Sequence, residues 1–266
     1  MDLDFDAYIK NKLSPHLVKT VDDLKFYGNI TPLIDEDFVE HKGNYRIYNL
    51  GEIVKKHYKI NKYNFRGKFD FVSPEQKIGF FGCSFTFSEG VDDGWIFKDI
   101  VENKSGCNCF NFGTLGASIE YIAYTFNAAS RVINFDKAAI ITLPDIYRSI
   151  YLQSNSKDTS HRNISHSTKT GYKKLDDAVK IVYMLPEEIF VQRAITNINW
   201  IVSTAKQKGM RVFLTSWSEE TYKILHRIFP KSTLNEMFPY IDRAADNLHP
   251  GLQSHRKFAE QVMSVI

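Results

Sequence analysis

The sequence predicts an α/β protein in which a parallel sheet is covered by helices on both faces. From Lys77 onward, short apolar runs alternate with longer amphipathic stretches, and turn residues separate them. Alternation of strands and helices is typical of βαβ units, which build a parallel sheet. The chain has 266 residues, 43% of them hydrophobic, which allows either one large α/β domain or one domain with a sizeable extension.

The expected elements follow one another in a regular order. Apolar runs predict four strands, at residues 77–82, 108–112, 138–143 and 210–217. Helical periodicity predicts five helices, at about residues 95–103, 118–133, 186–208, 219–228 and 250–265. Pro186 suits the first turn of the long third helix, and Gly209 ends that helix. His255, about two turns into the last helix, is expected at the surface.

Residues 1–70 lack this alternation and are expected to form an N-terminal elaboration packed on the main domain, residues 71–266. Helical patterns at Phe5–Leu17 and Leu50–Tyr58 lie there among turn-rich pieces. In the second half, the polar stretch from Ser154 to Gly171 predicts a long surface loop, with a substrate-contacting lid as the alternative.

Composition argues against several classes of function. The net charge of +3, from 34 basic and 31 acidic residues, is too balanced to indicate a nucleic-acid-binding surface. No apolar run approaches the roughly 20 residues of a membrane helix, and the acidic N-terminus lacks the pattern of a signal peptide. We therefore expect a cytoplasmic protein, with assembly into a larger particle left open.

Cofactor and metal signals are weak. The cysteines Cys83, Cys107 and Cys109 fall on or beside expected strands and are interpreted as small core residues in a reducing compartment. A Cys-x-Cys pair without further ligands at suitable spacing does not indicate zinc. Because no phosphate-binding glycine loop is visible either, we expect neither a cofactor nor a metal.

The strongest chemical signal comes from two short segments far apart in the chain. The first expected strand ends at Gly82-Cys83-Ser84, so a serine stands at the carboxyl edge of the sheet, where ligands bind. Asp246 and His249 lie three residues apart, just before the last expected helix. A serine hydroxyl needs a base to take its proton, and the base needs a carboxylate to orient it. Ser84 is therefore the candidate nucleophile, His249 its base and Asp246 the orienter, although each alone has an ordinary structural explanation.

These motifs resemble those of the SGNH (GDSL-type) hydrolase family, over about residues 61–266. Gly82-Cys83-Ser84 matches the first family motif, Gly-Asp-Ser, and Gly113-Thr114-Leu115-Gly116 matches the glycine motif after the second strand. Asp246-Asn247-Leu248-His249-Pro250 matches the last motif, Asp-x-x-His-Pro. Upstream, Asn64-Phe65-Arg66-Gly67 resembles a lead-in found in members associated with polysaccharide metabolism.

The resemblance implies a three-layer α/β/α sandwich with a five-stranded parallel, flavodoxin-like sheet. It implies an acyl-serine mechanism, in which the backbone N–H groups of Ser84 and Gly116 form part of the oxyanion hole. The implied substrate is an O-acyl ester, with an acetyl group on a carbohydrate as the first choice. O-acetyl transfer by the same residues, and a non-catalytic binding or structural module of a larger assembly, are the alternatives.

The chain departs from the family pattern at two motifs. Cys83 replaces the aspartate before the nucleophile, which has a supporting role. Thr142-Leu143-Pro144-Asp145 replaces Gly-x-Asn-Asp, so the oxyanion-binding asparagine is missing, a loss that typically lowers turnover about 100- to 1,000-fold. Near this edge, Asp145, Arg148 and Trp217 are candidate substrate-binding residues. The alternatives are a surface ion pair between Asp145 and Arg148, and core packing for Trp217.

Overall fold

A parallel four-stranded sheet forms the centre of the molecule. The computed structural model describes residues 19–26, 38–46, 53–63, 65–154, 159–164 and 182–266, together with Asp177 and Lys180. The strand order is β4-β3-β5-β8, at Asn108–Gly113, Lys77–Gly82, Ala138–Leu143 and Val212–Ser216. All four expected strands are present, within two residues of the expected bounds. The α/β class is therefore confirmed.

The five-stranded sheet implied by the family resemblance is wrong, since the described part of the chain contributes four strands to it. Where a fifth strand would pair with β8, residues 232–234 form two backbone hydrogen bonds with Leu214 and one isolated bridge. Further along, the pairing becomes irregular: the Glu236 carbonyl accepts from the Thr215 side chain, and the Phe238 backbone N–H donates to the Ser216 carbonyl at 3.0 Å. The edge of the sheet is thus covered by an irregular segment.

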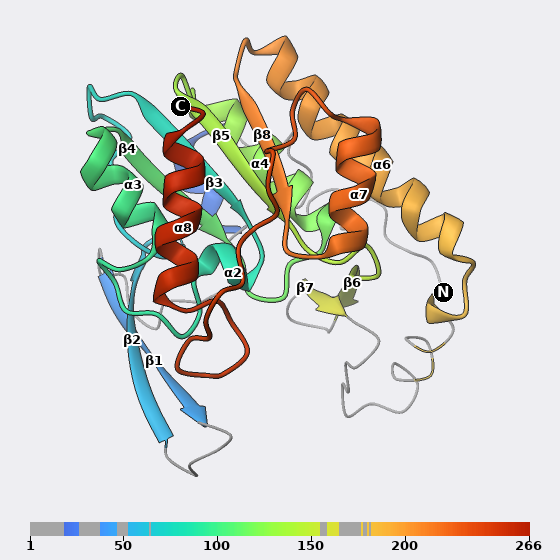
Figure 1. Cartoon of the computed structure of the whole chain (residues 1–266), viewed down its shortest axis with the longest axis horizontal. Coiled ribbons are helices and arrows are strands. Elements are labelled where there is room, and N and C mark those ends of the chain that lie inside the picture. The colour runs from blue at the N-terminus through green and yellow to red at the C-terminus, as the bar shows by residue number, and fades with distance from the viewer. Residues whose placement is uncertain are drawn as a thin grey trace.

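Helices cover both faces of the sheet, which makes a three-layer sandwich. α3 (Phe97–Ser105) packs against α8 (Leu252–Met263), and α4 (Ile119–Val132) packs against α6 (Glu187–Gln207). Right-handed crossovers place α3 and α4 on opposite faces, because the chain reverses its direction across the sheet at β4. Figure 1 shows α8 in front of the sheet and α4 behind it. α7 (Glu219–Ile228) packs beside β8.

Phenylalanine rings fill much of the core. Phe81 stacks on Phe112, with ring centroids 4.7 Å apart, and meets Phe126 edge-on. Phe65, which is fully buried, contacts Phe112 as well. The boundary expected at residue 70 stays a prediction, but Phe65, on its N-terminal side, belongs to the core of the main domain.

A hairpin precedes the central sheet, formed by β1 (Phe38–Arg46) and β2 (Ile53–Asn61). The helical pattern expected over residues 50–58 is therefore wrong from the start of β2. Leu50, Val54 and Tyr58 recur every four residues, a spacing that fits a helix. Pairing with β1 stabilises the strand instead. In it Tyr58 and Ile60 are buried, and Lys59 between them is exposed.

A second hairpin follows β5, formed by β6 (Ser149–Ser154) and β7 (Thr159–Ile164). The stretch expected as a loop, residues 154–171, thus contains a strand that pairs with the apolar run before it. Near the N-terminus, the 3-10 helix η2 (Val21–Phe26) packs against α4. The helix expected at residues 5–17 lies outside the described residues.

His255 is fully buried in α8, so the expected surface position is wrong. It shares one helix face with Phe258 and Val262, which are also buried. Its ring stacks on Phe97, and its Nδ1 accepts from the Phe97 backbone N–H at 3.3 Å. Burial, aided by the positive charge of Arg66, lowers the pKa of His255 to about 3. The imidazole is therefore a neutral core group.

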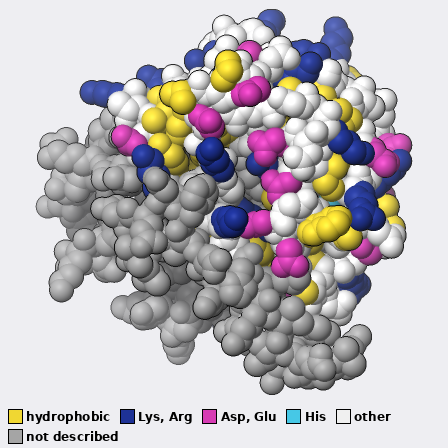
Figure 2. Space-filling view, turned by 90° about the vertical axis from the view of Figure 1, so that its left-hand side faces the viewer, with side chains coloured by type: hydrophobic (Ala, Val, Ile, Leu, Met, Phe, Trp, Pro, Cys, Tyr) yellow, Lys and Arg dark blue, Asp and Glu magenta, His cyan; other side chains and the backbone are white. Residues whose placement is uncertain are grey.

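The described surface mixes charges of both signs. Figure 2 shows Lys and Arg side chains interspersed with Asp and Glu on the described part of one face. All three cysteines are buried and form no disulfide. None of the described helices combines the length and apolar character needed to cross a lipid bilayer.

Candidate active site

Ser84 opens α2 (Ser84–Phe87), a one-turn helix directly after β3. The turn into this helix is tight, since a side chain at Gly82 or Gly113 would collide with α2. Asn111 Nδ2 donates to the Thr86 carbonyl at 2.9 Å and so fastens α2 to β4. Ser84 is thus held at the carboxyl edge of the sheet, as its position after the strand predicted.

Ser84, His249 and Asp246 form a continuous hydrogen-bonded chain. His249 Nε2 lies 2.8 Å from Ser84 Oγ, and His249 Nδ1 lies 2.5 Å from Asp246 Oδ2. Ser84 and Asp246 are buried, whereas the His249 side chain is 15% exposed. One ring nitrogen faces a hydroxyl and the other a carboxylate, which is the geometry that activation of a serine by histidine requires.

The Asp246 carboxylate is fixed by its own turn. Oδ1 accepts from the backbone N–H groups of Leu248 and His249, both at 3.0 Å, which leaves Oδ2 for the imidazole. Burial opposes the charged form, but the hydrogen bonds from the His249 side chain and from these backbone groups outweigh it. They hold the pKa of Asp246 below its usual value. The ionised carboxylate can keep the proton of the neutral imidazole on Nδ1.

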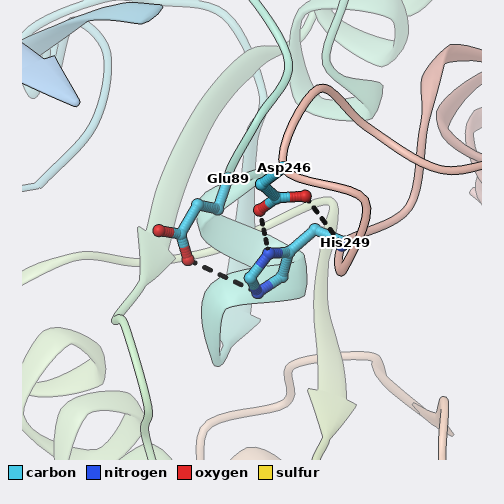
Figure 3. A group of neighbouring side chains, drawn as sticks. All are labelled: Glu89, Asp246 and His249. Atoms are coloured by element: carbon cyan, nitrogen blue, oxygen red, sulfur yellow. Dashed lines mark hydrogen bonds and ion pairs between the residues drawn. The ribbon is translucent and has the colours of Figure 1, made fainter. Parts of the chain in front are cut away.

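Glu89 is a further carboxylate at the imidazole, and no sequence pattern assigned it a role. Its Oε2 lies 3.4 Å from His249 Nε2, the nitrogen that also faces Ser84 (Figure 3). Potential ligand atoms of Glu89, Asp246 and His249 lie within 4.8 Å of one another. However, Glu89 faces Nε2 and Asp246 faces Nδ1 of the ring (Figure 3). The two carboxylates therefore lie around the imidazole and do not point at one common position for a metal ion. The available signal was an acidic residue five positions after Ser84, after a stretch in which phenylalanines alternate with hydroxyl residues.

The expected oxyanion donors lie in neighbouring turns. Ser84 is at the N-terminus of α2, where backbone N–H groups have no partner within the helix. Gly116 is exposed in the loop after β4, with a left-handed φ of 72°. In the same loop, Thr114 N donates to the Gly82 carbonyl at 3.0 Å, so this loop runs beside the turn that carries Ser84. Oxyanion binding by Ser84 and Gly116 stays a prediction.

The segment that replaces the asparagine motif has structural contacts. The Pro144 carbonyl accepts from Thr221 Oγ1 at 3.0 Å. Asp145 Oδ1 accepts from the Tyr147 backbone N–H at 2.7 Å, as turn-forming aspartates do. Among the described residues, Asp145 forms no ion pair with Arg148. Asp145 thus shapes the turn after β5, and a contact with substrate stays a prediction.

Arg148 and Trp217 lie together at the carboxyl edge. The guanidinium lies 5.2 Å from the centre of the Trp217 ring, and Trp217 stacks on Phe85, with ring centroids 4.9 Å apart. Phe85 in turn meets the His249 ring edge-on at 5.6 Å. Arg148 Nη1 and Trp217 Nε1 are both buried without a hydrogen-bond partner. The structure thus links both residues to the serine turn through Phe85, while their contact with substrate stays a prediction.

Comparison with known proteins finds matches among solved structures. No protein-family model matches the sequence, and no curated protein sequence matches it significantly. A lipolytic protein of the G-D-S-L family from Desulfitobacterium hafniense DCB-2 is 13% identical, with a TM-score of 0.44 over 72% of this chain and 99% of that chain.

Carbohydrate esterases of family 2 match as well. The enzyme from Corynascus thermopiles is 11% identical, with a TM-score of 0.43 over 80% of this chain and 70% of that chain. The enzyme from Clostridium thermocellum, solved in complex with cellohexaose, is 13% identical, with a TM-score of 0.43 over 75% of this chain and 66% of that chain. All of these matches have 11–13% identity and TM-scores below 0.5, and no property of the matched proteins is transferred to this chain.

Proposed function

We propose that this protein is a serine esterase that cleaves an O-acyl ester through an acyl-serine intermediate. The observation that carries the proposal is the hydrogen-bonded chain from Asp246 through His249 to Ser84, at 2.5 and 2.8 Å. Independent turns of the fold hold both ends of this chain, α2 for Ser84 and the backbone-capped turn for Asp246. Such preorganisation is what nucleophilic catalysis needs.

The reaction has two balanced steps. Ser84 Oγ attacks the ester carbonyl while His249 Nε2 takes the hydroxyl proton, and Asp246 stabilises the imidazolium that forms. The carbon–oxygen bond to the alcohol then breaks, and Nε2 gives its proton to the leaving oxygen. In the second step a water molecule attacks acyl-Ser84, with Nε2 again taking a proton. The acid leaves, and Ser84 regains its hydrogen.

We assign the acyl group as acetyl and the alcohol as a carbohydrate hydroxyl. The acetyl group rests on the family resemblance alone. The carbohydrate is supported by the lead-in Asn64-Phe65-Arg66-Gly67, which resembles that of family members associated with polysaccharide metabolism. In this chain, Arg66 is fully buried and donates to the carbonyl oxygens of Phe87 and Ser88, the last residue and the C-cap of the helix that carries Ser84. The lead-in thus contacts the same turn as the nucleophile.

Slow turnover is part of the proposal. Pro144 has neither an N–H group nor a side-chain donor, so it does not supply the donor that an asparagine would give. Loss of one oxyanion donor typically lowers turnover by about 100- to 1,000-fold. The same departure favours a non-catalytic module, whereas the hydrogen-bonded Ser84, His249 and Asp246 argue against it, because a binding module has no need of that geometry.

Ester hydrolysis by matched variants tests the proposal. Wild type, Ser84→Ala and His249→Ala are incubated with p-nitrophenyl acetate, with Ser264→Ala, an exposed serine in the C-cap of α8, as the control. We expect turnover by wild type and by the control, and loss of turnover in the other two variants. Hydrolysis by Ser84→Ala at the wild-type rate would exclude Ser84 as the nucleophile. With a sugar acceptor present, free acetate indicates a hydrolase and acetylated sugar indicates a transferase.

A further inference from the structure

Glu89 lies beside His249, the residue that gives a proton to the leaving alcohol in the proposed reaction. We infer that Glu89 is a specificity-determining residue, whose carboxylate binds hydroxyl groups of the alcohol part of the ester. It thereby favours esters of neutral polyhydroxy alcohols over esters of simple or anionic alcohols. The inference rests on the proposed function, because it requires His249 to deliver a proton to the leaving oxygen.

The position of the leaving oxygen follows from the chemistry of His249. Nε2 takes the proton of Ser84 Oγ, 2.8 Å away, and must then give it to the alcohol oxygen. That oxygen therefore lies within hydrogen-bond reach of Nε2 during the reaction. Glu89 Oε2 is 3.4 Å from the same nitrogen, so the carboxylate lies beside the place that the leaving oxygen takes.

A carboxylate in this place discriminates between alcohols by charge and by hydrogen bonding. An ionised carboxylate accepts hydrogen bonds and donates none, so a hydroxyl on the carbon next to the leaving oxygen is a suitable partner. An ethyl group offers no such donor, and a phosphate or carboxylate in the same place is repelled. The Glu89 side chain is 23% exposed and that of His249 15%, so both remain accessible from solvent.

Glu89 is held in a strained, well-supported turn. Ser88, before it, is fully buried and has a left-handed φ of 68°, and Gly90, after it, has a φ of 81°. Arg66 donates to carbonyl oxygens on both sides of Glu89, and Tyr58 Oη accepts from the Gly90 N–H at 2.7 Å. Strained backbone of this kind persists only where the surroundings hold it, and it clusters at functional sites.

Because the turn is fixed before substrate binds, the backbone that carries the Glu89 carboxylate needs little further ordering on binding. Its supports reach it from the segment around β2, residues 58–66, which lies far from Ser84 in sequence. That segment thereby contributes to the choice of alcohol without touching the alcohol itself.

The test is a ratio of two substrates in matched variants. Wild type, Glu89→Gln, Glu89→Ala and the exposed control Glu260→Gln are assayed for kcat/KM on glycerol monoacetate and on ethyl acetate. We expect the glycerol-to-ethyl ratio to fall about ten-fold or more in Glu89→Ala, as for loss of a hydrogen bond to a charged group. Glu89→Gln keeps the shape of the side chain, and we expect it to hydrolyse the acetate ester of glycerol phosphate better, relative to glycerol monoacetate, than wild type does.

The outcomes separate the inference from the proposed function. If wild type cleaves both esters and the ratio is unchanged in both Glu89 variants, the inference is wrong and the proposed function stands. An equal loss on both esters leaves the ratio unchanged and also overturns the inference, because Glu89 then acts only through His249. If folded wild type cleaves neither ester, both the proposed function and the inference fall.

Discussion

Arg66 Nη1 donates to the carbonyl oxygen of Ser88 at 2.6 Å. This hydrogen bond links the segment after β2 to the turn at Ser88 to Gly90, which follows the helix of the candidate nucleophile Ser84. The Arg66 side chain is completely buried, lies over the Tyr58 ring at 4.3 Å and pairs with Asp93 at 2.6 Å. A guanidinium can make these several directed bonds at once, which an ammonium group cannot. This residue therefore acts on the site by positioning the turn that carries Glu89.

Arg66→Lys is expected to destabilise the protein and to slow ester hydrolysis. Several buried carbonyl oxygens lose their donor, which we expect to lower the free energy of unfolding by about 2–4 kcal/mol. Urea unfolding and kcat/KM measure the two effects, with Arg131→Lys on the exposed side of α4 as the control. Unfolding of Arg66→Lys at the same urea concentration as wild type would contradict the positioning role.

Gly90 and Gly94 form a matched pair for testing the contact between the two site loops. Both have a left-handed φ, 81° and 87°. A Cβ at Gly90 would lie 2.7 Å from the Ala244 Cβ and 3.3 Å from the Asp246 carboxylate, whereas a Cβ at Gly94 would meet nothing within 4 Å. Gly94→Ala thus reports the backbone strain alone, about 1–2 kcal/mol.

Gly90→Ala is expected to cost about 1–3 kcal/mol more than Gly94→Ala, because its methyl group overpacks the loop of Asp246. The same displacement should lower kcat by up to about 100-fold, since small misplacements of catalytic groups have effects of that size. Thermal unfolding and ester hydrolysis are measured on both variants. Equal behaviour of the two would show that the loops do not constrain each other.

Asp246→Asn separates the two functions of this carboxylate. The amide oxygen can still accept from the backbone N–H groups of Leu248 and His249. Its NH2 group then faces Nδ1 and imposes the wrong imidazole tautomer, so we expect kcat to fall by about 10,000-fold with little loss of stability. Ester hydrolysis and urea unfolding check this. Wild-type turnover in Asp246→Asn would mean that the Nδ1 contact is not needed.

His255 predicts a loss of stability in acid. Burial lowers its pKa from the usual 6.5 to about 3 in the folded protein. The unfolded chain therefore binds the proton first, and stability that is fully present above about pH 6.5 is lost as the pH falls toward 3. The slope reaches about 1.4 kcal/mol per pH unit. In His255→Gln the free energy of unfolding, measured with urea at several pH values, should depend less on pH between 6 and 4. The same pH dependence in the variant and in wild type would contradict this assignment.

The strands of the central sheet, and the meeting of Ser84, His249 and Asp246 at its carboxyl edge, could be predicted from the sequence. Buried parallel strands are nearly continuous apolar runs, and residues that end such strands meet at one edge of the sheet. His255 could not be placed, because a polar residue on a buried helix face reads as a surface residue until its neighbours are known. The hairpin strand β2 was missed because Leu50, Val54 and Tyr58 recur at helical spacing, and pairing with β1 leaves no local signal in the sequence.

Glu89 could not be predicted, for a different reason. Its contact with His249 depends on the left-handed backbone of Ser88, which local propensity disfavours for a serine. That conformation is held by Arg66, about twenty residues earlier in the chain. Long-range hydrogen bonds that stabilise strain leave no local pattern in a sequence. The prediction of a fifth strand was wrong for a similar reason. The segment beside β8 forms one isolated bridge with it, in place of the continuous strand pairing that the family resemblance implied.

Labelling by a serine-reactive fluorophosphonate, located by peptide mass spectrometry, tests the central claim most directly. If Ser84 is activated by His249 and Asp246, wild type carries the phosphonyl group on Ser84, and His249→Ala reacts far more slowly although Ser84 is still present. Labelling absent from Ser84 in folded wild type, or equally fast in His249→Ala, would contradict a serine esterase and favour a binding module with the same fold.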